Sequence, residues 1–110
     1  MNFFIGDSIK EINEQDNNII FSDELVDYIY KMRNYATCDM SKLYQIHPYI
    51  DVEISKNDLP QIIEICEYIL DAEMLTNVDE LNEGIEMVKN LLEIAQMALS
   101  RNQGLVSIGD

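Results

Sequence analysis

The strongest constraint on the fold is the run of residues 57–88, in which apolar side chains recur at helical spacing and every charged side chain is acidic. The run holds no lysine and no arginine. Its nine acids are Asp58, Glu64, Glu67, Asp71, Glu73, Asp79, Glu80, Glu83 and Glu86. Apolar residues spaced by three and four indicate helices that bury one face. The run therefore predicts helices with an apolar inner side and an acidic outer side.

The first of these helices is expected to begin at Asp58 and to end between residues 72 and 75. Asp58 can cap it, Gln61 can complete a capping box, and Pro60 lies in the first turn, where a missing N–H costs nothing. The predicted inward face comprises Leu59, Ile62, Ile63, Cys66, Ile69 and Leu70. The predicted outer face comprises Glu64, Glu67 and Asp71, with Tyr68 at its edge.

A second, longer helix is predicted to begin with capping-box spacing at Asn77 and to run to about residue 102. Gly104 is then expected at the position just after the helix. The predicted central stripe consists of Leu81, Ile85, Val88, Leu92, Ala95 and Leu99, and Met87, Leu91, Ile94 and Ala98 widen it to nearly half the circumference. The polar side includes Asp79, Glu83 and Glu86. Only a few residues connect the two helices, so we expect them to lie antiparallel as neighbours.

The rest of the chain predicts shorter elements. Ser22 should cap a helix that runs to about residue 36 with Tyr35 on its inward side, and Asp39 should cap a short helix to about residue 46. Short strands are expected at residues 2–5, 18–22 and 51–55, while residues 105–108 read as a strand or a loose tail. The expected fold is α+β and mainly helical, with three to four helices around a long C-terminal helix in one domain, residues 1–110.

The formal net charge of −14, from 21 acids against seven bases, argues against nucleic acid or an anionic membrane as a partner. No segment approaches the roughly 18 apolar residues of a membrane span, and the first residues lack the basic start of a signal peptide. The cytoplasm is therefore the expected location.

Known catalytic and metal-binding patterns are missing from the sequence. There is one histidine, His47, and the two cysteines, Cys38 and Cys66, form no CxxC motif. Cys66 is expected as a buried, reduced thiol. The four glycines match no phosphate loop, and the carboxylates follow no calcium-loop pattern. We therefore expect no catalytic residue, no metal and no cofactor.

The acidic outer face is the candidate partner-binding surface. Its residues are Glu64, Glu67, Tyr68 and Asp71 on the first helix and Asp79, Glu83 and Glu86 on the second. Acids at the rim of an interface speed the encounter with a basic protein, while a few tyrosines or apolar residues supply most of the affinity. The competing interpretation is a solvated helix face that only maintains solubility.

The compact, acidic character of the chain, its opening MNFFIGDSI and its helix DLPQIIEICEYIL resemble small bacterial immunity proteins of toxin–immunity systems. The resemblance implies a non-enzymatic protein that binds a cognate toxin, often a nuclease, and blocks its active site or substrate groove. It assigns no role to individual residues. DNA mimicry toward a DNA-binding protein is a variant of this hypothesis. The alternatives are a structural or regulatory interaction module, including a homodimer, and an enzyme that uses carboxylate chemistry.

Overall fold

The computed structural model describes residues 1–13, 15–75 and 82–109. In chain order, its elements are β1 (Asn2–Ile5), the 3-10 turn η1 (Ile9–Glu11), β2 (Asn18–Ile20), α1 (Asp23–Lys31), the 3-10 turn η2 (Arg33–Tyr35), α2 (Ser41–Tyr44), β3 (Val52–Ile54), α3 (Leu59–Asp71), α4 (Asn82–Ser100) and β4 (Leu105–Ile108). The α+β class and the long helix near the C-terminus are confirmed. The predicted start at Asn77 and the stripe residue Leu81 lie outside the described residues.

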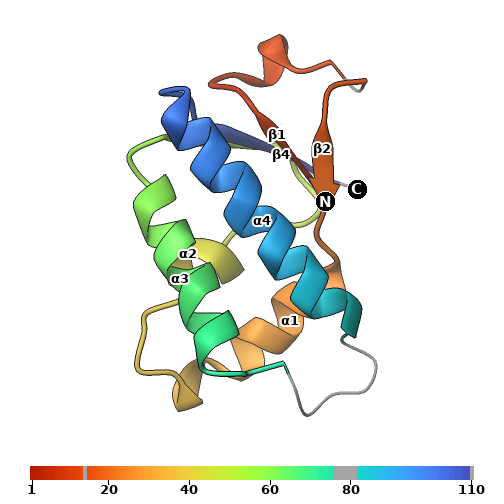
Figure 1. The fold of residues 1–110 in the computed structure, drawn as a ribbon. Coiled ribbons are helices and arrows are strands. Elements are labelled where there is room, and N and C mark those ends of the chain that lie inside the picture. Colours follow the sequence, from red (N-terminus) through yellow and green to blue (C-terminus); the bar gives the residue numbers. More distant parts are fainter. Residues whose placement is uncertain (14, 76–81, 110) are drawn as a thin grey trace.

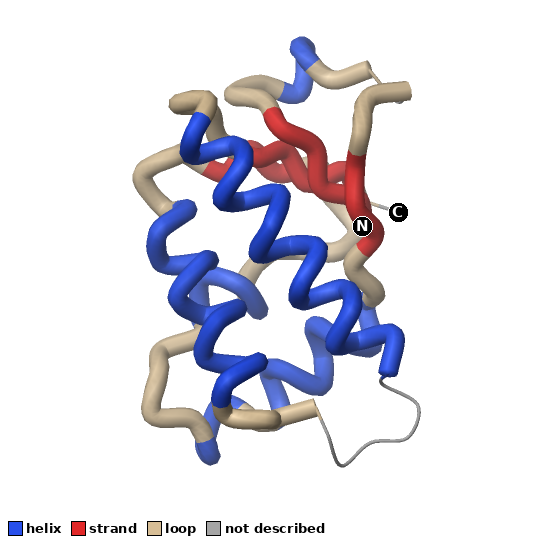
Figure 2. Tube along the Cα trace, in the orientation of Figure 1, coloured by secondary structure: helices blue, strands red, loops and turns tan. Residues whose placement is uncertain are grey.

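The described strands form one antiparallel sheet in the order β2-β1-β4-β3. Phe3 of β1 lies opposite Ile19 of β2 on one side and Ser107 of β4 on the other. Residues 105–108 are therefore an interior strand and not a loose tail, and Leu105, Val106 and Ser107 are buried. The first and last of the described strands, β1 and β4, are consequently neighbours in the sheet (Figure 2).

The helix α4 packs over one face of this sheet, and α3 packs against α4. Figure 1 shows α4 running across the sheet, with α3 beside it and antiparallel to it, as the short connection predicted. The buried core includes Phe3, Phe21, Leu25, Ile29, Met40, Leu43, Leu59, Ile62, Ile65, Ile69, Val88, Leu91, Ala95, Ala98 and Leu105. Burial of a large apolar side chain stabilises a fold by about 1.5–3 kcal/mol, so this layer holds the helices in place.

The buried side of α4 lies within the predicted apolar side, but it is centred differently from the predicted stripe. Leu91, Ile94 and Ala98 are buried, whereas Leu92 is half-buried and Leu99 is 39% exposed. Val88 and Ala95 of the predicted stripe are buried, which confirms that part of it, whereas Leu92 and Leu99 lie off the most buried side. The physical reason is that α4 packs against β1 and β2 as well as against α3, so its most buried side is turned toward the sheet.

The inward face of α3 is also shifted relative to the prediction. Ile65, which was not assigned to that face, is buried, while Ile63 and Leu70 are only half-buried. This helix packs against α2 as well as α4. The side of α3 that carries Ile65 is therefore covered as well. Helical periodicity alone could not identify α2 as a second neighbour of α3.

The predicted caps have mixed outcomes. The side chain of Ser22 accepts a hydrogen bond from the N–H of Leu25 at 3.3 Å, which confirms this cap. Asp58 caps nothing: its backbone has φ −92° and ψ −13°, and its side chain makes no capping bond. A cap side chain reaches the first N–H groups from an extended backbone, and Asp58 is already in the helical region. Its carboxylate lies 3.3 Å from the ammonium of Lys42.

The first helix is shorter than predicted. α1 ends at Lys31 and passes through Met32 into η2, and Tyr35 is 79% exposed. The prediction of Tyr35 on the inward side is therefore wrong. A 3-10 turn has three residues per turn, against 3.6 for an α-helix. The change of pitch after Met32 directs Tyr35 away from the core.

The C-terminal end of α4 depends on Asn102, and the prediction for Gly104 is wrong. Asn102 has a positive φ of 58°. Its N–H donates to the carbonyl of Leu99 at 3.0 Å, and that of Gln103 donates to the carbonyl of Ala98 at 2.9 Å, the pattern of a Schellman motif. Gly104 is required for a different reason: a Cβ there would lie 2.2 Å from the carbonyl oxygen of Ile54.

Candidate functional site

The outer face of α3 carries three exposed carboxylates, Glu64, Glu67 and Asp71, which we call the α3 acid face. Their spacing places them on the side of α3 opposite the buried Ile62 and Ile69. Within the described chain, none of the three forms an ion pair with a lysine, arginine or histidine. The α3 acid face therefore presents an uncompensated negative field to solvent.

Tyr68 lies at the edge of the α3 acid face and is half-buried. Its hydroxyl oxygen accepts hydrogen bonds from the hydroxyl of Thr37 at 3.4 Å and from the Thr37 N–H at 3.0 Å. Both bonds favour the phenolate, and they lower the pKa of Tyr68. Tyr68 thus links α3 to the loop before α2 and places an aromatic ring beside the carboxylates.

Glu64 also borders a depression of about 500 Å³ next to α2. Cys38 lines the same depression, and its thiol has a raised pKa because it is partly buried and lies near Glu64 and Asp39. A raised pKa keeps the thiol protonated and slow to react. This depression therefore offers a polar surface and lacks an activated nucleophile.

The predicted residues of α4 lie in a different place. Glu83 and Glu86 are exposed and line a depression together with Ile20 of β2. Glu86 lies 3.9 Å from Lys89, and both side chains are largely exposed, so this pair contributes little. Asp79 lies outside the described residues. The structure therefore places Glu64 beside α2 and Glu83 and Glu86 beside β2, in separate depressions.

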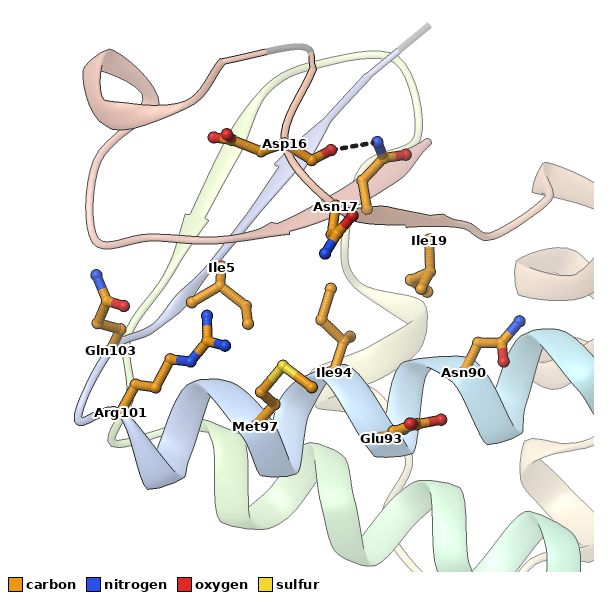
Figure 3. Close-up of a pocket in the computed structure, with 11 residues that line it drawn as sticks. Ile5, Asp16, Asn17, Ile19, Asn90, Glu93, Ile94, Met97, Arg101 and Gln103 are labelled. Carbon is orange, nitrogen blue, oxygen red and sulfur yellow. Dashed lines mark hydrogen bonds between the residues drawn. The ribbon is translucent and has the colours of Figure 1, made fainter.

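The depression at Glu83 and Glu86 continues into a second one along α4, of about 530 Å³. The two share Asn18, Ile19 and Asn90, and together we call them the α4–β2 groove. Figure 3 shows Ile5, Ile19, Ile94 and Met97 between α4 and the strands, with Arg101 and Gln103 at one end. Sequence reasoning missed this groove. Its one detectable signal was Met97, an apolar residue on the polar side of the helix.

The remaining candidates for chemistry are separated or buried. His47 accepts a hydrogen bond at Nδ1 from the N–H of Tyr49 at 3.2 Å, and Cys66 is a buried free thiol, as predicted. Across residues 1–13, 15–75 and 82–109, no three His, Cys, Asp or Glu side chains are grouped to hold a metal ion. None of the described helices has the length and apolar content needed to cross a membrane.

Comparison with known proteins adds no family to this picture. No family model, no curated protein and no solved structure matches the chain.

Proposed function

We propose that this chain is a non-enzymatic acidic binding protein that neutralises a basic bacterial toxin, in the manner of an immunity protein. The supporting observation is the α3 acid face, where Glu64, Glu67 and Asp71 are exposed and have no cationic partner within the described chain. A basic partner would supply the missing positive charges.

A nuclease is the proposed class of toxin. Enzymes that act on RNA or DNA bind phosphates through lysine and arginine, so their substrate grooves are basic. Carboxylates spaced along a helix can occupy such a groove in place of phosphates. The formal net charge of −14 would also steer the encounter, and such fields raise association rates by about 10–10³-fold. Tyr68 would supply a buried aromatic contact at the edge of this surface.

The test is co-expression of the protein with the product of its neighbouring gene, with growth of the host cells as the readout. Growth is expected when both proteins are made, and arrest when the neighbouring product is made alone. The triple variant Glu64→Gln, Glu67→Gln, Asp71→Asn should lose protection and bind the partner more weakly.

The matched control is Glu24→Gln, Asp27→Asn, Glu53→Gln, which changes the same charge at exposed positions on α1 and β3. It should protect nearly as well as the wild type. Equal protection by both triple variants would show that the surface assignment is wrong. The proposed function itself is wrong if the wild-type protein neither protects the cells nor binds the neighbouring product at low salt.

A further inference from the structure

The outer strand β2 leaves its backbone open on one side. Met1 and Phe21 exchange two hydrogen bonds, from the amino group of Met1 to the Phe21 carbonyl at 3.1 Å and from the Phe21 N–H to the Met1 carbonyl at 2.9 Å. In an antiparallel pair, such residues alternate with residues whose N–H and C=O point away. The backbone groups of Asn18 and Ile20 are therefore directed outward from β1.

Proteins commonly protect such an edge with charge, proline or a covering segment. The strand β2 carries no charge or proline, and the side chain of Ile20 is 62% exposed. Its edge therefore has the features of a template for another strand.

The α4–β2 groove lies directly beside this edge. A residue added opposite Ile19 would point its side chain to the same sheet face as Ile19, which is the face covered by α4. There the floor is apolar, with Ile19, Met87, Ile94 and Met97. An extended segment added to β2 would thus place alternate side chains against the apolar floor of this groove.

The charges around the groove define what kind of segment fits. The lining side chains include four acids, Asp16, Glu83, Glu86 and Glu93, against one base, Arg101. A segment with lysine or arginine beside apolar residues would complement this rim. A second copy of this chain would bring its own formal charge of −14 to the same acids, so the charge favours a basic partner over self-association.

We propose that the α4–β2 groove binds a basic, extended segment of a partner protein as an additional strand on β2. Main-chain hydrogen bonds to Asn18 and Ile20 supply part of the affinity, and the groove selects apolar side chains flanked by cations. The inference rests on the proposed function for the nature of the partner. It adds a second contact region, separate from the α3 acid face.

The first test uses a synthetic peptide of about eight residues, titrated into the full-length ¹⁵N-labelled protein. Valine and lysine alternate at the positions that face α4, and serine occupies the positions between them. The amide signals of Asn18, Ile20 and Asn90 should shift, and the Ile20 N–H should exchange more slowly with solvent. A peptide with glutamate in place of lysine should not bind. The same lysine peptide with its alternate amides N-methylated should bind at least about tenfold more weakly, because it cannot donate to the edge.

Two variants of the protein test separately the backbone edge of β2 and the acidic rim of the α4–β2 groove. Ile20→Pro removes an N–H that faces away from β1, a site where an edge strand tolerates proline, and it should abolish peptide binding. Glu83→Gln, Glu86→Gln, Glu93→Gln should weaken binding about tenfold at low salt. Should Ile20→Pro fail to fold, the N-methylated peptide tests the edge in the unchanged protein. The α3 triple variant should bind the peptide normally.

The outcomes distinguish this inference from the proposed function. Three results would overturn the groove assignment. The N-methylated peptide could bind as tightly as the unmodified one, or the signal shifts could be confined to α3. Light scattering could also show that the wild type is a dimer and that Ile20→Pro is a monomer. The toxin partner could bind Ile20→Pro as tightly as it binds the wild type and fail to bind the α3 triple variant. In that case the assignment of the groove as a binding site is wrong and the proposed function stands. If the groove binds the peptide but no basic toxin is found, the proposed function fails alone.

Discussion

The thiol of Cys66 provides a direct test of the core on α3. This side chain is 0% exposed, and burial, with a smaller effect from Glu67, raises its pKa from 9.0 to about 12. In the unfolded chain the same thiol returns to its ordinary pKa. Below about pH 9 the thiol is protonated in both states, so the full stability is present there.

Above that pH the two states differ. The unfolded chain loses the proton while the folded chain keeps it, so the free energy of unfolding falls by about 1.4 kcal/mol per pH unit. From about pH 9 to pH 11 the expected loss is about 3 kcal/mol, and it continues until the pH reaches the folded pKa of about 12.

The assay is urea unfolding in the presence of a reducing agent, from about pH 8 to pH 11, on the wild type and on Cys66→Ala. The variant is less stable at neutral pH because it leaves a cavity, but it lacks the titrating thiol. The other ionising groups act in both proteins. The difference in free energy of unfolding between wild type and variant should therefore shrink as the pH rises. A stability difference that stays constant within about 0.5 kcal/mol across this range would refute the buried position of the thiol.

Three further changes test local features of the fold. Gly104→Ala should destabilise the protein by about 3 kcal/mol in urea unfolding, because the new Cβ would lie 2.2 Å from the Ile54 carbonyl oxygen; a loss below about 0.5 kcal/mol would contradict that contact. Asn102→Ala should cost about 1 kcal/mol at a φ of 58°, whereas Asn102→Gly should cost less, and equal melting temperatures for the two variants would exclude the left-handed helix end. Tyr68→Phe removes the acceptor of the Thr37 N–H, so that amide should exchange faster with solvent; an unchanged exchange rate would contradict the hydrogen bond.

The position of the acids bears on how a partner would be held. The α3 acid face and the acids of the α4–β2 groove border different depressions, so one rigid helix of a partner would not be expected to satisfy both. A partner with a basic surface and a separate extended segment would engage the two regions together. Two linked contacts raise the effective concentration of the second once the first is made.

Much of the local structure followed from the sequence alone. Helical spacing and acid placement predicted α3 and its exposed Glu64, Glu67 and Asp71, because a helix with one apolar side has only one way to face a core. The cap at Ser22, the strand at residues 2–5 and the antiparallel helix pair also follow from local rules, and all three are present.

Only the tertiary structure decided which sides of the helices are most buried and where the strands pair. The rotation of α4 toward the sheet, the burial of Ile65 and the interior place of β4 depend on neighbours distant in sequence. Asn102 takes the position after the helix that was expected for Gly104. Gly104 is needed for another reason, because β3 passes close to residue 104. The α4–β2 groove arises in the same way: it lies between a strand near the start of the chain and a helix near its end. Local periodicity carries no information about how β2 and α4 lie against each other, because the packing of the whole core determines their positions.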